Sequence, residues 1–247
     1  MKIFYHIDVA TRVKEVAKVN GWMQVNDLNA TGGEGFLLSL EDGRLAISDL
    51  SEKSWKPLCI DFLDPQFLLR LKKVEHETQL IKRAIGHKPQ EDIGIWDATA
   101  GLGRDAMVLA KLGYRVTTVE RSPVLHELLF DAFERARESE DLKESISRLK
   151  LLSGDSKQLL TDLDENLRPD IIYLDPMYPE AKKSAQPKKE MQLLRKLLGP
   201  DNNLSELLQV SRSIAKKKVI VKNSPFADLK LVPKYSLNSK SVRLDVY

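Results

Sequence analysis

The chain has little of the chemistry that would mark a secreted, metal-bound or membrane-embedded protein. Its one cysteine, Cys59, cannot form a disulfide within the chain, which favours a reducing compartment. The four histidines lie far apart and no cysteine pairs accompany them, which speaks against a metal site. His6 and Asp8 interrupt any apolar signal segment, and no run approaches the roughly 20 apolar residues of a membrane span. We expect a cytoplasmic protein without metal or membrane contact.

What the chain does have is the composition of a folded globular protein. Hydrophobic residues make up 42% and charged residues 30% of its 247 residues, which excludes a disordered chain. The formal net charge of +3 hides an uneven distribution. From Tyr178 to Tyr247 there are 15 Lys and Arg against 6 Asp and Glu, whereas the preceding part has 24 against 30. The sequence thus predicts an acidic first part and a strongly basic end.

The apolar pattern divides the chain into two parts. The first sixty or so residues read as short strands with turns, including a hairpin at Asp42-Gly43, and one helix is predicted from Pro65 to Gly86. Strands and helices then alternate, which predicts an α/β, doubly wound, Rossmann-like parallel sheet. We place a small N-terminal β-rich α+β unit with a linking helix at 1–75 and the main domain at 76–247. The strands predicted in the main domain are 93–97, 114–120, 149–155, 170–175, 217–222 and the tail.

Polar segments follow the predicted strands, at the edge of the sheet where such folds bind ligands. DATAGLGRDA (97–106) joins the first strand to its helix, and its glycines permit a tight turn and the close approach of a ligand. Glu120 ends the second strand, where an acid commonly accepts hydrogen bonds from ribose hydroxyls. Asp155 and Ser156 follow the third strand and are placed to contact an adenine edge. These segments predict a nucleoside-containing ligand.

Two kinds of nucleoside ligand fit the glycine-rich loop. Gly101, Gly103 and Ala106 match the looser dinucleotide fingerprint, so a nicotinamide or flavin oxidoreductase is one alternative. A pyrophosphate on the helix N-terminus would, however, lie beside Asp105 and near Asp97, which would repel it. S-adenosylmethionine has no phosphate and carries a positive sulfonium and ammonium, which these acids attract. The loop therefore favours the methyl donor as cofactor.

The segment DPMYP (175–179), after the fourth strand, predicts the chemistry. It is close to the motif of methyltransferases that modify amino groups of adenine, guanine or glutamine. The Asp175 carboxylate and a carbonyl near Pro176 can accept the two N–H bonds of an exocyclic amine and orient its nitrogen toward the methyl group. Tyr178 offers a ring on which a base can stack, a contact worth roughly 1–3 kcal/mol. We therefore predict catalytic roles for these three residues.

Lysines gather directly after this segment. Lys182, Lys183, Lys188 and Lys189 would form a basic rim beside a base-reading pocket, as binding of an RNA backbone requires. We predict that these four bind RNA. A second group at 216–218 and 222, around the fifth strand, is equally compatible with RNA contact and with a solvated surface.

Taken together, these motifs resemble the RsmJ family, bacterial small-subunit ribosomal RNA guanine-N2 methyltransferases. The resemblance covers about residues 92–225 and rests on DATAGLGRDA, YLDPMYP, the KKEM run, VIVK and the ER and DS pairs at 120–121 and 155–156. It implies a class I methyltransferase sheet, S-adenosylmethionine as donor, and a guanine near the 3′ end of 16S rRNA in the small ribosomal subunit as acceptor. It assigns donor-binding positions to Arg104, Asp105, Glu120, Arg121, Asp155, Ser156 and Asp175, which join Asp97, Gly101 and Gly103 of the loop.

Other functions fit part of the pattern. The enzyme could methylate another RNA base, a protein glutamine or a small amine, although the lysine groups favour nucleic acid. A non-catalytic RNA-binding protein with a vestigial methyltransferase fold is a further alternative. The intact DPMYP segment argues against it, because a protein without catalysis has no need of an amine-orienting turn.

Overall fold

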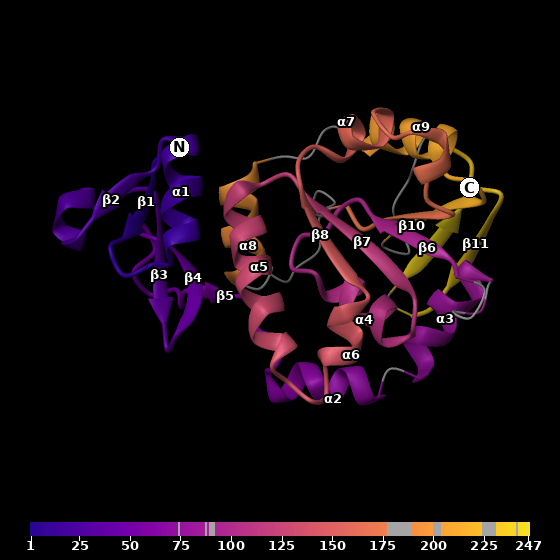
Figure 1. The fold of residues 1–247 in the computed structure, drawn as a ribbon, viewed down its shortest axis with the longest axis horizontal. Helices are drawn as coiled ribbons and strands as arrows, with labels where there is room; N and C mark the ends of the chain where they lie inside the picture. The colour runs from indigo at the N-terminus through magenta and orange to yellow at the C-terminus, as the bar shows by residue number, and fades with distance from the viewer. Residues whose placement is uncertain are drawn as a thin grey trace.

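The chain folds around two sheets, which Figure 1 shows side by side. The computed structural model describes all residues except 74, 87, 89–91, 177–188, 200–203, 224–230 and 241. The first sheet has the strand order β2-β1-β3-β4-β5. β1 is parallel to both of its neighbours, and β4 is antiparallel to both of its own. Its strands are β1 (Ile3–His6), β2 (Met23–Val25), β3 (Phe36–Glu41), β4 (Arg44–Asp49) and β5 (Leu58–Cys59).

The predicted hairpin joins β3 to β4. Glu41 pairs with Arg44, so only Asp42 and Gly43 form the loop. Both have positive φ, 51° and 75°, as a type I′ turn requires, and Asn/Asp-Gly is the dipeptide that best tolerates this conformation. The hairpin is thus confirmed, together with the local reason for it.

The strands and turns predicted for the first sixty residues are accompanied by a helix that was not predicted, α1 (Thr11–Asn20). The helix buries only Val13 and Ala17, one turn apart, against the first sheet, and Ala10 provides no side-chain cap. Its end is regular, with Gly21 in the left-handed conformation at φ 66° and donating to the Ala17 carbonyl. So narrow a buried face gives a weak periodic signal.

The second sheet confirms the predicted Rossmann-like fold. Its order is β11-β12-β10-β9-β6-β7-β8, with parallel pairing from β8 to β10. β12 is inserted antiparallel between β10 and β11, which is the closing hairpin expected of the tail. The strands are β6 (Gly94–Asp97), β7 (Arg115–Glu120), β8 (Leu149–Ser153), β9 (Ile171–Leu174), β10 (Lys218–Asn223), β11 (Tyr235–Asn238) and β12 (Arg243–Val246).

Helices cover both faces of this sheet (Figure 1). Ile95 belongs to a core with α4 and α5 on one face, whereas the next residue, Trp96, packs with α7 and α9 on the other. Two helices flank residue 74 where one long helix is predicted. The helices are α2 (Pro65–Lys73), α3 (Glu75–Ile85), α4 (Arg104–Lys111), α5 (Pro123–Arg137), α6 (Lys143–Ser147), α7 (Ser156–Thr161), α8 (Lys189–Leu198) and α9 (Leu204–Ile214). None of the helices described is long and apolar enough to cross a bilayer.

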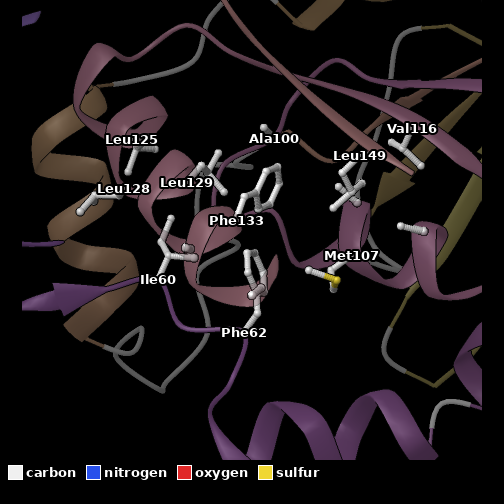
Figure 2. Packing of buried hydrophobic residues seen from close by; sticks show 14 of the residues in the cluster. Ile60, Phe62, Ala100, Met107, Val116, Leu125, Leu128, Leu129, Phe133 and Leu149 are labelled. Carbon is white, nitrogen blue, oxygen red and sulfur yellow. The ribbon is translucent and has the colours of Figure 1, made fainter. Parts of the chain in front are cut away.

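The first sheet packs on α5, with the indigo N-terminal strands beside this helix in Figure 1. One hydrophobic core runs from Leu38 and Ile47 of the first sheet through Phe62 to Phe133 of α5. Figure 2 shows the rings of Phe62 and Phe133, whose centroids are 5.6 Å apart. The boundary predicted at residue 75 falls where α3 begins, and the division into two units stays a prediction.

Candidate active site

A pocket of about 310 Å³ lies at the carboxyl ends of the parallel strands. It is formed by the loop after β6 and by the residues that end or follow β7, β8 and β9, in agreement with the rule for doubly wound sheets. Nine of the ten predicted donor-binding residues line it, and Pro176 does so too. The nine are Asp97, Gly101, Arg104, Asp105, Glu120, Arg121, Asp155, Ser156 and Asp175.

Gly103 is the one predicted donor-binding residue that does not line the pocket, and it packs against the hydrophobic core. Its φ is 68°, and a Cβ atom there would come within 2.6 Å of Leu129 Cδ2 and 3.1 Å of Phe62. Both neighbours belong to the core drawn in Figure 2. At Gly101, with φ 53°, the nearest atom to such a Cβ is the Thr99 carbonyl oxygen at 3.8 Å. Gly101 therefore leaves space for a ligand to approach, whereas Gly103 allows α4 to begin close to α5.

Glu120 fixes the turn of the glycine-rich loop. Its buried carboxylate accepts the backbone N–H of Gly101 at 3.0 Å and that of Ser122 at 2.7 Å. Burial raises the pKa of Glu120, while these two donors oppose the rise. Each carboxylate oxygen can accept a second hydrogen bond, so the group can also bind a hydroxyl in the pocket. This is the geometry that recognition of a ribose requires.

The segment after β8 is held by its own side chains. Asp155 caps α7 by accepting the backbone N–H of Gln158 at 3.1 Å. Ser156 is buried, and its hydroxyl donates to the Ala98 carbonyl at 2.6 Å. Ser156 thereby ties this segment to the glycine-rich loop across the pocket wall.

An apolar wall faces these polar groups. It consists of side chains of α8 and α9, residues near the starts of α4 and α5, and one residue at the end of β7. The Arg104 guanidinium at the start of α4 contacts Glu190 Oε1 of α8 at 2.7 Å, which holds the two helices together. An apolar wall with a few convergent polar groups is the usual surface for an aromatic base. The apolar residues are Leu102, Val119, Leu125, Met191, Leu194, Leu198 and Leu207.

The floor of the pocket holds three acids and one lysine. Lys222 Nζ lies 2.7 Å from Asp105 Oδ2 and 2.8 Å from Asp175 Oδ2, and Tyr173 donates its hydroxyl to Asp105 at 2.8 Å. Burial, then the charges of Asp105 and Asp175, raise the pKa of Asp97 to about 8. Desolvation and Asp105 raise the pKa of Asp175 to about 6, against the opposing effect of Lys222.

Sequence reasoning missed Lys222 as a pocket residue and grouped it with the lysines around the fifth strand. Val221 pairs with Leu174 in the parallel register of β10 and β9, so Lys222 comes to lie beside Asp175. The alternation of side chains along the strand could have indicated this position. Ile220 packs toward α4 and α5, and Lys222, two residues later, lies on the same face of the sheet. The pocket is therefore less acidic than its sequence indicates.

The other lysines of that group have structural partners. Lys216 donates to the Asn166 carbonyl, Lys217 pairs with Asp170, and Lys218 donates to the carbonyls of Ala84 and Ile85 at the end of α3. These contacts favour a structural role for the three. Of the residues predicted to act on RNA, Lys189 is exposed at the start of α8. Tyr178, Lys182, Lys183 and Lys188 lie outside the described residues.

Comparison with known proteins agrees with this geometry. Residues 21–247 match the family described as "Putative SAM-dependent methyltransferase". A crystal structure of a SAM-dependent methyltransferase from Neisseria gonorrhoeae is 28% identical, with a TM-score of 0.77 over 100% of this chain and 95% of that one. The fold is thus that of a Rossmann-like methyltransferase, and its cofactor is S-adenosylmethionine.

Curated relatives narrow the family further. Ribosomal RNA small subunit methyltransferase J from Thioalkalivibrio sulfidiphilus is 39% identical over 88% of this chain and 86% of its own length. The protein of the same name from Pseudoalteromonas atlantica is also 39% identical, over 94% and 93%. The one from Pseudomonas aeruginosa is 40% identical over 86% and 82%. The chain belongs to the ribosomal RNA small subunit methyltransferase J (RsmJ) family.

The residues of the pocket fit the methyl donor of this family. S-adenosylmethionine is positively charged, and the pocket lining holds five Asp and Glu residues against four Lys and Arg residues. The apolar wall and the Glu120 carboxylate suit its adenosine part. Within the described part of the chain, no group of three or more His, Cys, Asp or Glu residues is arranged to hold a metal ion.

Proposed function

We propose that this enzyme transfers a methyl group from S-adenosylmethionine to the exocyclic N2 of a guanine near the 3′ end of 16S rRNA. Methylation of small-subunit ribosomal RNA is the activity that the names of its relatives state. One observation carries the finer proposal: Asp175 and Pro176 follow β9 and line the donor pocket. An amine bound there would lie beside the methyl donor. The acceptor is either naked 16S rRNA or the small ribosomal subunit.

The proposed roles toward the donor follow from the pocket. Asp97 and Asp105 would attract its positive groups, Glu120 its ribose, and Asp155 with Ser156 the edge of its adenine. Arg104 and Arg121 line the same wall, and Gly101 gives the ligand room to approach. When bound, S-adenosylmethionine supplies an electrophilic methyl group on a positively charged sulfur.

The proposed roles toward the acceptor concern the amine. Its lone pair is delocalised into the base, so it is a poor nucleophile that must be oriented. The Asp175 carboxylate and the Pro176 carbonyl would accept its two N–H bonds. The nitrogen lone pair then forms the bond to the methyl carbon, and the carbon–sulfur bond breaks with its electron pair on sulfur. The nitrogen afterwards gives up one proton, to Asp175 or to water.

The basic end of the chain supports an RNA substrate. We assign Tyr178 to stacking on the target base, and Lys182, Lys183, Lys188 and Lys189 to the phosphates around it. A base that is stacked or paired must first be flipped out to reach the pocket. Lys189 has the required exposure at the start of α8.

The test is methylation of defined substrates. The purified enzyme and labelled S-adenosylmethionine are incubated with naked 16S rRNA, with small subunits from cells that lack this enzyme, and with protein extract. Mass spectrometry of the nucleosides is expected to show N2-methylguanosine in one RNA sample. Asp175→Ala is expected to abolish transfer and leave the thermal unfolding unchanged. Transfer of the label to another base or to protein would show that guanine is not the acceptor.

A further inference from the structure

The proposed function gives no role to Lys222, although it lies in the pocket. Its ammonium would repel the sulfonium and the ammonium of the donor, and it is already paired within the pocket. Its contacts are with two carboxylates, Asp105 at 2.7 Å and Asp175 at 2.8 Å. Its role therefore concerns these two carboxylates.

Lys222 bridges two carboxylates: Asp105 holds it in place, and Asp175 is the residue assigned to the target amine. Asp105, on α4, accepts both the Lys222 ammonium and the Tyr173 hydroxyl through Oδ2, which fixes its position. Asp175 is held at its backbone, because its N–H donates to the Thr99 hydroxyl at 2.6 Å. The Asp175 side chain is 38% exposed, so an incoming amine can reach it. Lys222 thus bonds one carboxylate oxygen of an accessible side chain whose backbone is already fixed.

The charges around Asp175 explain why a cation is needed. Among the described residues, the groups that face it are Asp97 of β6, Asp105 of α4, Tyr173 of β9 and Lys222 of β10. Two of these are acids, and only Lys222 is positive. Without it, Asp175 would hold a proton at neutral pH. A protonated carboxyl donates a hydrogen bond through that proton and is a weaker acceptor for an amine.

We propose that Lys222 is a positioning residue for methyl transfer. Its ammonium, anchored on Asp105, keeps the Asp175 carboxylate ionised and oriented to accept an N–H of the target amine. The inference rests on the proposed function, since it takes the assignment of Asp175 to the amine from there. Lys222 itself forms no bond to the reacting atoms and gives up no proton.

The test is the pH profile of single-turnover methyl transfer with saturating donor and RNA. We expect the wild-type rate to fall in acid as Asp175 takes up a proton. Lys222→Met moves the acid midpoint up by about one pH unit or more, so the rate at neutral pH falls about twofold or more and recovers in base. Lys222→Arg restores most of the rate. Lys150→Met, a matched change at an exposed lysine of β8, follows the wild type.

A second variant is expected to shift the acid midpoint in the opposite direction. Asp105→Asn removes a repelling charge and leaves Lys222 beside Asp175, so the acid midpoint is expected to move below that of the wild type. Thermal unfolding checks that each variant is folded, and Asp105→Asn keeps the test decisive if Lys222→Met does not fold. An unchanged midpoint in the folded variants, with or without a uniform loss of rate, would overturn the proposal.

An arm without RNA separates this inference from the proposed function. Donor binding is measured by calorimetry at neutral pH in two buffers with different heats of ionisation, which gives the number of protons released. The free pocket of Lys222→Met holds an additional proton, so the cationic donor expels more protons from it than from the wild type. Equal release contradicts the role of Lys222 whatever the RNA results are. A wild type that methylates no RNA contradicts the proposed function alone.

Discussion

Glu120 and Gly101 are joined by a hydrogen bond of 3.0 Å from the glycine N–H to the buried carboxylate. This bond links the end of β7 to the turn after β6, two segments that are 19 positions apart in the sequence. The same side chain thus shapes the loop and faces the pocket. A substitution of Glu120 is therefore expected to lower the affinity for the ligand in two ways. It weakens the hydrogen bond that shapes the loop, and it removes an acceptor from the pocket.

Glu120→Gln tests this double role. The amide keeps the size of the side chain but presents an NH₂ group to one of the two N–H donors. We expect the affinity for S-adenosylmethionine to fall by about 1.5–3 kcal/mol, the typical value for hydrogen bonds to a charged group. Titration calorimetry measures it. Glu144→Gln, at an exposed glutamate of α6, is the control, and equal affinities in the two variants would remove Glu120 from the site.

Asp97 is expected to make the stability of the free enzyme fall with rising pH. Its pKa is raised from 3.8 to about 8 by burial and neighbouring acids, so the folded state binds the proton more tightly than the unfolded state. This contribution to stability is fully present below 3.8 and is lost as the pH rises through about 8.

Chemical denaturation of the wild type and of Asp97→Asn across this pH range checks the sign. The variant is expected to lose less stability than the wild type as the pH rises. Asp8→Asn, at an exposed carboxylate, should follow the wild type. Parallel curves for Asp97→Asn and the wild type would show that Asp97 is ionised throughout.

Gly103→Ala is expected to destabilise the fold more than a change at a glycine with open surroundings. The new Cβ would meet Leu129 Cδ2 at 2.6 Å in a left-handed conformation, and strain with overpacking predicts a loss of about 2–4 kcal/mol. Gly21→Ala has a similar φ of 66° and no atom within 4 Å. It is expected to lose about 1 kcal/mol from strain alone. Urea denaturation of both variants measures the difference, and equal losses would contradict the steric argument.

Arg135→Met is expected to weaken the attachment of the first sheet to α5. The guanidinium contacts Asp61 at 2.8 Å, Asp131 at 2.9 Å and the Ile60 carbonyl at 2.5 Å, and is mostly buried. Its removal takes a charged donor from all three acceptors, although Asp131 keeps the N–H of Leu45 and Asp61 keeps Arg44 and the N–H of Leu63. The loss of these charged hydrogen bonds predicts a loss of about 2–3 kcal/mol. Arg137→Met, whose pair with Glu134 is half exposed, should cost about 0.5 kcal/mol or less. Thermal unfolding of the two variants gives the comparison.

The alternation of strands and helices in the main domain and the location of the pocket could be predicted because both follow from local patterns. Apolar residues of β6 and β9 pack on both faces of the sheet, which gives the continuous runs expected of buried parallel strands. The polar residues that end such runs then meet at one edge. Nine donor-binding candidates came together in the pocket for this reason.

What could not be predicted depends on contacts between distant segments. The role of Lys222 is set by the register between β10 and β9, and the packing of Gly103 by helix α5. Arg104 contacts Glu190, 86 positions away, which no local pattern indicates. The helix α1 was missed for the opposite reason, since its two buried residues give too weak a local signal.

Helix α5 connects the pocket to the N-terminal region. Leu125, near its start, forms part of the pocket wall, while Glu127 and Asp131 further along contact Arg12 and Leu45 of the N-terminal region. One helix therefore lines the pocket at one end and supports the first sheet further along. If RNA binds that sheet, the two ligands become thermodynamically coupled, and each changes the affinity of the other by the same factor. The N-terminal region would then act on catalysis without contributing an atom to the pocket.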